Sequence, residues 1–178
     1  MVDPVPLLKG QKEIIELVKG LASDAPHNFL PPSEGTRPTS EHVLPFSLVR
    51  GTRGYIERVV NQMNGCYEKG WFDGCAVMMR RLIETLIIEC FEKSGIADTI
   101  KDERTGEFLY LRDLIDRLLH EKSWNLCRIT KQALPKLKNV GDQSAHSRRY
   151  NANREDIDKL ANDFRVVCQE LIYLAQLK

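Results

Sequence analysis

The sequence predicts an all-α protein, built as a bundle of about five to six helices. Its apolar residues recur three to four positions apart, which is the spacing of one helix face. No segment shows the sustained alternation of apolar and polar residues, bounded by turns, that is typical of strands. With 42% hydrophobic and 29% charged residues, the composition is that of a chain able to form a packed core.

The strongest helical pattern covers residues 72–93. The apolar residues of this segment form one wide stripe that comprises Cys75, Ala76, Met79, Leu82, Ile83, Leu86, Ile87, Cys90 and Phe91. A stripe this wide predicts a central helix that touches several neighbours. Asp73 is expected to cap its beginning.

Further helices are predicted at residues 7–22, 48–69 and 108–120. Ser123 is expected to cap another helix that runs through Ile129 to Leu134, after which Pro135 either kinks it or opens a new turn. The helical pattern then fades near residues 140–141. Asn153, with Asp156 three residues later, predicts a capping arrangement that opens the last helix.

Prolines divide the chain into two regions. Five of its eight prolines lie between residues 24 and 46. Because proline fixes φ and lacks a backbone donor, this segment is expected to be a loop or linker. We therefore predict an N-terminal helix with a Pro-rich linker at residues 1–46, followed by a helical bundle at residues 47–178.

Charge and cysteine content exclude several classes of protein. The net charge is +1, so bulk charge favours neither nucleic acid nor membrane as a partner. No stretch approaches the ~18 apolar residues of a membrane span, and the N-terminus carries no secretory signal pattern. The odd number of cysteines, five, includes no CxxC pair and predicts reduced thiols in a cytoplasmic protein. Neither a metal site nor a cofactor is expected.

Local charge is less even. Residues 128–154 hold seven Lys or Arg residues and a single acid, Asp142, around His146. This run is either a surface that contacts phosphates or a solvated face. The candidate nucleic-acid-binding residues within it are Lys136, Lys138, Arg148, Arg149 and Arg154. Tyr150 is the only aromatic residue of the run, so base stacking has little support.

Two motifs, in a helical context, resemble a bacterial helical family of the HEPN superfamily. The first is the start of the 72–93 helix with Arg81 and Glu84 one turn apart, and the second is the segment from Gly141 and Asp142 to Ala145-His146. The resembling family, a domain of unknown function, occurs alone and attached to restriction-enzyme subunits. The resemblance covers roughly residues 50–177 and implies an HEPN-like bundle.

The resemblance also implies two alternative functions. Many HEPN domains are metal-independent ribonucleases that carry an Arg a few residues ahead of a His and act as dimers. Here the residues at 139–141 are Asn, Val and Gly, and the nearest upstream cation is Lys138. This departure favours a non-catalytic module that dimerises and binds nucleic acid or a nucleic-acid-processing partner, such as a component of a restriction or defence system.

The alternatives remain open at the level of sequence. In an RNA endonuclease, His146 would act as general acid or base, Asp142 would orient it, and Lys138 or Arg81 would stabilise phosphorane charge. Arg81 and Glu84 would then form a polar cluster that reaches His146; otherwise they are an ordinary ion pair on a helix. The third possibility is a purely structural or regulatory protein-interaction domain.

Overall fold

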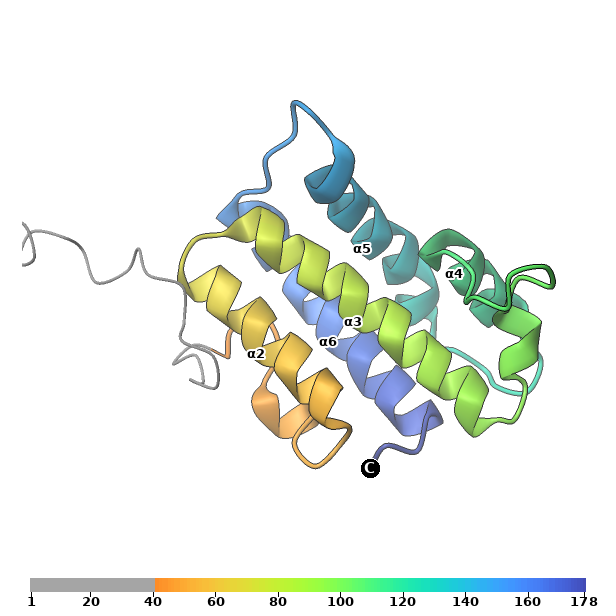
Figure 1. Cartoon of the computed structure of the whole chain (residues 1–178). Coiled ribbons are helices and arrows are strands. Elements are labelled where there is room, and N and C mark those ends of the chain that lie inside the picture. Colours follow the sequence, from red (N-terminus) through yellow and green to blue (C-terminus); the bar gives the residue numbers. More distant parts are fainter. Residues whose placement is uncertain (1–40) are drawn as a thin grey trace, which may run out of the picture. The chain divides into compact units, whose positions relative to one another are not determined.

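The computed structural model describes residues 41–178, which fold into a bundle of five α-helices (Figure 1). The elements in chain order are η1 (Phe46–Leu48), α2 (Gly54–Glu68), α3 (Phe72–Lys93), η2 (Ala97–Ile100), α4 (Leu111–His120), α5 (Arg128–His146) and α6 (Arg154–Leu174). The described part contains no strand, only an isolated bridge between Lys101 and Phe108. The all-α prediction is confirmed, whereas the helix predicted at residues 7–22 lies outside the described residues.

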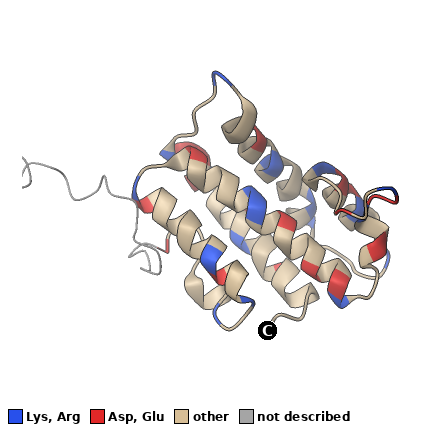
Figure 2. Cartoon of the chain, in the orientation of Figure 1, with Lys and Arg blue, Asp and Glu red and all other residues tan. Residues whose placement is uncertain are grey.

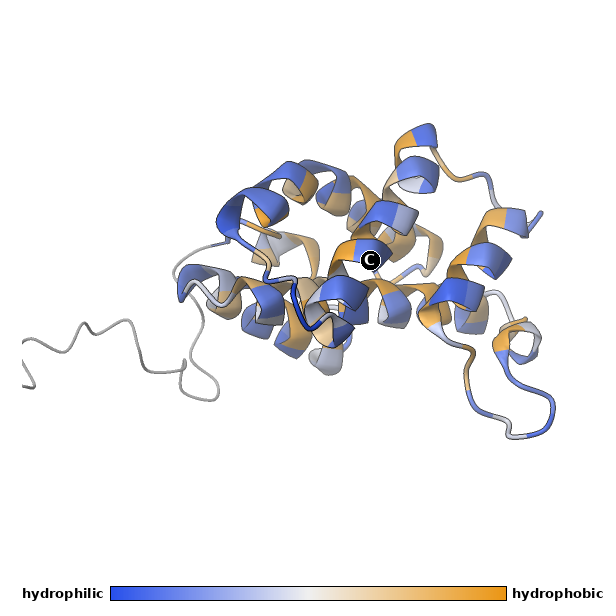
Figure 3. Ribbon diagram, turned by 90° about the horizontal axis from the view of Figure 1, so that it is seen from above, coloured by the Kyte–Doolittle hydropathy of each residue, from blue (hydrophilic) through white to orange (hydrophobic). Residues whose placement is uncertain are grey.

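The central element is α3, which packs against α2, α4, α5 and α6 (Figure 1). Its bounds are those predicted, and all nine residues of its predicted apolar stripe are buried. Apolar residues of the other helices face inward around it (Figure 3). No helix of the described part is long and apolar enough to cross a membrane.

Three helices end in the same way. After α2, α3 and α6, a residue with positive φ turns the chain out of the helix: Gly70 (+77°), Gly95 (+72°) and Gln176 (+48°). In each case the residue after it donates its N–H to a carbonyl of the last turn, which satisfies acceptors that the helix leaves open. Gln176 is the only non-glycine residue with positive φ among residues 41–178, so its backbone is strained.

The structure corrects the prediction for α5. This helix runs without interruption from Arg128 to His146, so Pro135 lies inside it and opens no new helix, and the helix does not end near residues 140–141. Its buried residues Ala133, Leu134 and Leu137 belong to the core, and this packing outweighs the local cost of Pro and Gly. Its N-cap is Cys127, whose Sγ accepts from the Thr130 N–H, and not Ser123.

Capping predictions at the other helices had mixed outcomes. Asn153 and Asp156 form the predicted capping box at the start of α6. Asp73 does not cap α3, because the N-cap position is Trp71 and no side chain caps this end. The predicted helices at 48–69 and 108–120 begin later, at Gly54 and Leu111.

Residues just before α2 also belong to the bundle. Val43, Leu44 and Phe46 are buried in the same core as the helices. The folded unit therefore includes residues on the N-terminal side of the division predicted at 46/47, and the rest of the predicted linker lies outside the described residues.

Candidate functional site

A cluster of four charged side chains joins α3 to α5. Arg80 of α3 donates from Nε to Oδ1 of Asp142 at 2.7 Å and from Nη1 to Oε2 of Glu84 at 3.4 Å. Lys138, one turn before Asp142 on α5, donates its ammonium to Oδ2 of the same carboxylate. All four side chains are between a quarter and a third exposed, so the cluster lies at the rim of the helix interface.

Gly141 allows α5 to approach α3 at this cluster. A Cβ atom at this position would lie 2.6 Å from the Cβ of Arg80 and 3.2 Å from the carbonyl oxygen of Ala76. Carbon atoms in contact are normally about 3.5–4.0 Å apart. Only glycine therefore fits here, and the contact places the α5 backbone directly against the root of the Arg80 side chain.

Asp142 is the most constrained acid of the cluster. Burial alone would raise its pKa, but the hydrogen bonds and positive charges of Lys138 and Arg80 outweigh burial and leave the pKa below its usual value. Two cations face two carboxylates, so the cluster has no net charge. Both oxygens of Asp142 are occupied by these partners, and the carboxylate holds helices together rather than orienting His146.

The predicted pairing of Arg81 with Glu84 is wrong. Glu84 pairs with Arg80, and Arg81 is exposed rather than partly buried. The sequence contained the signal for this arrangement. At 3.6 residues per turn, Arg80 lies about 80° from the centre of the apolar stripe of α3, whereas Arg81 lies about 180° from it. The i,i+4 spacing of Arg80 and Glu84 also suits a helical ion pair.

His146 is the last residue of α5 and is exposed. Within residues 41–178 its side chain has no hydrogen bond or ion pair. Lys138 lies eight residues earlier on the same helix, a rise of about 12 Å, and its ammonium is directed to Asp142. Arg81 lies on the outer face of α3. The structure of one chain thus does not assemble His146, Asp142, Lys138 and Arg81 into a single constellation.

Basic residues line the outer side of α5 and the loop that follows it. Those that are exposed and have no acidic partner in the described part of the chain form what we term the basic face: Arg128, Lys131, Lys136, Arg148 and Arg149. The only acid of α5, Asp142, is already paired. Figure 2 shows the basic tip of the loop between α5 and α6 projecting from the bundle.

Two predicted nucleic-acid-binding residues have partners within the protein. Lys138 bonds to Asp142. Arg154, at the start of α6, donates to the Tyr67 hydroxyl at 3.1 Å, and its guanidinium lies over the rings of Tyr67 and Phe72, at 5.0 and 5.5 Å from their centres. Of the five predicted residues, Lys136, Arg148 and Arg149 remain available to a partner.

The loop that carries Arg148 and Arg149 is anchored at both ends. Ser147 Oγ accepts from the backbone N–H groups of Arg149 and Tyr150 at 3.3 and 3.1 Å. At the far end, Asp73 of α3 accepts from the Ala152 N–H at 2.9 Å. The loop therefore presents its two arginines from a defined backbone.

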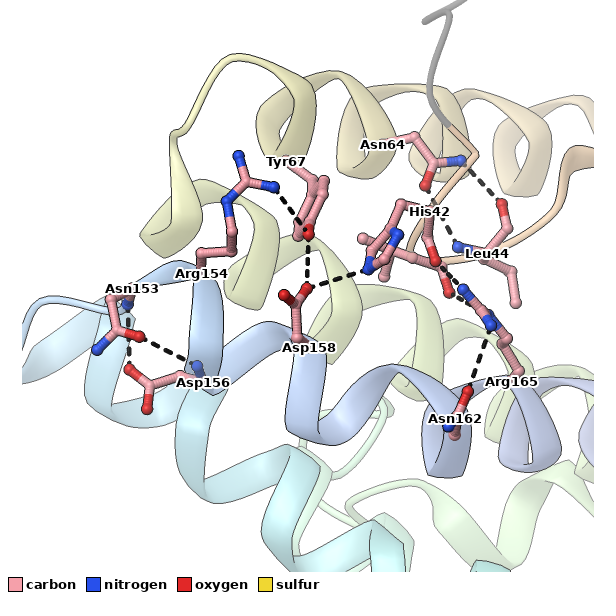
Figure 4. A network of polar contacts seen from close by, with 11 residues as sticks. His42, Leu44, Asn64, Tyr67, Asn153, Arg154, Asp156, Asp158, Asn162 and Arg165 are labelled. Carbon is pink, nitrogen blue, oxygen red and sulfur yellow. Dashed lines mark hydrogen bonds and ion pairs between the residues drawn. The ribbon is translucent and has the colours of Figure 1, made fainter.

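A second polar network joins α2, α6 and the residues just before α2 (Figure 4). Asp158 of α6 accepts from the Tyr67 hydroxyl at 2.5 Å and lies 3.0 Å from Nε2 of His42. The His42 ring stacks on Tyr67, with ring centres 4.7 Å apart. Burial, followed by the hydrogen bond and charge of Asp158, raises the pKa of Tyr67, so the phenol stays a donor.

Backbone contacts complete this network. The buried side chain of Asn64 donates to the Leu44 carbonyl at 2.8 Å and accepts from its N–H at 3.3 Å. Arg165 donates to the carbonyls of His42 and Val43. These contacts hold the residues just before α2 against α2 and α6, which is a structural role that the sequence did not reveal.

The described residues contain neither a cluster of metal-ligating side chains nor a disulfide. No three His, Cys, Asp or Glu side chains of residues 41–178 gather closely enough to hold a metal ion. All five cysteines are free. Burial raises the pKa of the Cys75 and Cys90 thiols to about 12, so these thiols are not nucleophiles at neutral pH.

The chain matches no protein-family model, no curated protein and no solved structure. The resemblance to the HEPN superfamily therefore rests on the sequence motifs, and the function rests on the site described above.

Proposed function

We propose that this chain is a non-catalytic, HEPN-like helical module that binds nucleic acid through the basic face. The observation that carries the proposal is that five exposed cations lie on α5 and the following loop with no acidic partner among the described residues. In a chain of net charge +1, this concentration of charge is local. Free thiols at all five cysteines agree with a cytoplasmic setting.

The arrangement suits a phosphate backbone. Arg128 and Lys136 are eight residues apart on one helix, so they are separated by a rise of about 12 Å. Arg148 and Arg149 extend the same positive surface beyond the helix end. Lysine and arginine that contact phosphates release condensed counterions, which gives affinity without sequence specificity. The paucity of aromatic residues on this surface favours backbone contacts over base stacking.

The experiment is a fluorescence-anisotropy titration of labelled single-stranded RNA and duplex DNA with the wild type and two double variants. The variants are Lys131→Gln with Lys136→Gln, and Arg148→Gln with Arg149→Gln. Each lost phosphate contact should weaken binding about fivefold near 0.1 M salt, so each double variant should bind roughly 25-fold more weakly.

A matched control removes two positive charges elsewhere. Arg50 and Arg58 are exposed residues outside the basic face, Arg50 preceding α2 and Arg58 within it, and α2 packs on α3 rather than on α5. The double variant Arg50→Gln with Arg58→Gln should therefore bind like the wild type. Equal loss in all three variants would attribute binding to net charge and contradict a specific basic face.

The competing function, a metal-independent RNA endonuclease, has its own test. His146 is exposed beside Arg148 and Arg149, and a second chain could bring a further group to it. Cleavage of a mixed RNA pool in EDTA, by wild type but not by His146→Ala, would overturn the non-catalytic proposal. We expect no cleavage by either protein.

Self-association is part of the proposal, and it is supported by the family resemblance alone. Light scattering coupled to size-exclusion chromatography should give twice the mass of one chain. A monomer would remove the dimer from the proposal without affecting the basic face. A partner of the nucleic-acid-processing kind, for example in a restriction or defence system, would occupy the same basic surface only if it were itself acidic.

A further inference from the structure

A carboxylate with no hydrogen bond is buried near the end of α3. Three polar or charged residues are buried in the described part of the chain, namely Asn64, Glu89 and Thr130. Asn64 and Thr130 are hydrogen-bonded. Glu89, whose side chain is only 7% exposed, has no hydrogen bond among residues 41–178, and its one ionic partner, Arg53, lies 3.6 Å away with a side chain that is 63% exposed.

This carboxylate lines a cavity of about 490 Å³. The lining comes from the turn before α2, the last turns of α3 and the residues that end α6, and consists of Gly51, Thr52, Arg53, Glu89, Glu92, Lys93, Ala175, Gln176 and Leu177. The volume is in the range of small-molecule sites, which is about 300–1,000 Å³. A buried carboxylate that keeps its charge needs donors, and the cavity is the place from which they can come.

The charges around the cavity indicate what would fill it. Arg53 and Lys93 supply two positive charges, and Glu89 and Glu92 supply two negative ones, so the lining is neutral as a whole. The buried charged group of the lining is the carboxylate of Glu89. The C-terminal ends of α3 and α6, whose free carbonyl groups carry partial negative charge, lie at the same cavity. The positive charge of Arg53 lies nearer the solvent.

We propose that this cavity binds a small zwitterion of the free α-amino acid class. The ammonium group of the ligand donates to the Glu89 carboxylate, and its carboxylate accepts from Arg53 and Lys93. A ligand without net charge matches a lining without net charge. Gln176, whose backbone is strained at a φ of +48°, is one of the residues that line the cavity. Strained backbone of this kind is often found at ligand sites.

The site is separate from the basic face. It lies at the ends of α3 and α6 and before α2, whereas the basic face belongs to α5 and the loop after it. Amino acid binding and nucleic-acid binding can therefore succeed or fail independently.

The experiment is a thermal-shift screen of the full chain with the common L-amino acids one at a time, followed by calorimetric titration of any that raises the unfolding midpoint. Matched fragments test the two-point recognition: ethylamine and propionate each carry one of the two charged groups of alanine. We expect at least one amino acid to raise the midpoint, and the corresponding amine and acid alone to have no such effect.

Two variants place the ligand. Glu89→Gln keeps the size of the side chain and should weaken binding at least about tenfold, because it removes the charge from a hydrogen bond. Arg53→Gln, at an exposed position, should weaken binding similarly. Glu107→Gln, an exposed acid away from the cavity, is the control and should bind like the wild type.

The proposal is overturned if no amino acid raises the midpoint of the wild type, or if the amine alone is as effective as the zwitterion. It is also overturned if both Glu89→Gln and Arg53→Gln bind as tightly as the wild type. If Glu89→Gln fails to fold, the titration of Arg53→Gln decides the question.

Discussion

Replacement of Gly141 by alanine tests the account of the α3–α5 interface most sharply. In an exposed helix interior, Gly→Ala stabilises a protein by about 1 kcal/mol, because alanine has the higher helix propensity. Gly141 lies within α5, so propensity alone predicts a more stable protein. The structure predicts the opposite result.

The magnitude follows from the contact distances. The new Cβ would lie 2.6 Å from the Cβ of Arg80, about 1 Å closer than carbon atoms can comfortably be. Both atoms are fixed to helix backbones, so the helices themselves must move apart. Overpacking of this kind costs about 1–3 kcal/mol. With the upper value and the propensity gain of about 1 kcal/mol, Gly141→Ala should destabilise the fold by about 2 kcal/mol.

The assay is urea unfolding followed by circular dichroism, with a thermal scan beside it. The midpoint should fall by roughly 4–8 °C in a chain of this size. Gly54→Ala is the matched control, since a Cβ there meets nothing within 4 Å, and it should be neutral or slightly stabilising. A Gly141→Ala protein as stable as the wild type would refute the close contact between α3 and α5.

Three further changes probe other parts of the fold. Asn153→Ala removes the capping box of α6 and should lower the free energy of unfolding by about 1 kcal/mol in urea titrations, whereas an unchanged value would deny the cap a role. Gln176→Gly removes the side chain that makes a positive φ unfavourable at the end of α6. It should raise the free energy of unfolding by about 0.5–1 kcal/mol and so raise the thermal midpoint slightly. A lower midpoint would mean that the contacts of the Gln176 side chain stabilise the fold by more than the backbone strain costs. The lowered pKa of Asp142 implies that its contribution is fully present above the unfolded pKa of about 3.9 and is lost as pH falls through the folded value. The stability difference between wild type and Asp142→Asn should therefore shrink as pH drops below about 4, and a constant difference down to pH 2 would contradict the pairing with Lys138 and Arg80.

The helices that the sequence predicted best are those whose local signals and packing agree. The wide apolar stripe of residues 72–93 identified α3 from end to end, and the pair Asn153 and Asp156 identified the start of α6. In these segments periodicity and capping chemistry act within a few residues, so one sequence is enough to read them.

The prediction failed for α5, where long-range packing overrides local propensity. Pro135 and Gly141 both argue against a continuous helix, yet buried residues on one face hold α5 together as a single helix. Gly141 is required by its contact with Arg80, a residue on another helix, and no local pattern reveals such a contact.

The site was predicted in part. Glu84, Asp142 and Lys138 were each predicted as site residues, but around His146 and together with Arg81. The structure instead joins these three side chains through Arg80, which was not among the predicted site residues. The burial of Glu89 was not predicted, because an acid between the apolar residues of the α3 stripe carries no local signal of its burial. A role for Asp142 in orienting His146 depends on which side chains lie across the helix interface, and this is decided by the fold.

The central claim is that the basic face binds a phosphate backbone, and the salt dependence of binding tests it most directly. The logarithm of the binding constant for single-stranded RNA is measured against the logarithm of salt concentration, for wild type and for Lys131→Gln with Lys136→Gln. With about 0.7 per phosphate contact, the five cations of the face should give a slope near −3.5, and the variant should be shallower by about 1.4. A slope near zero, or the same slope in both proteins, would contradict the account.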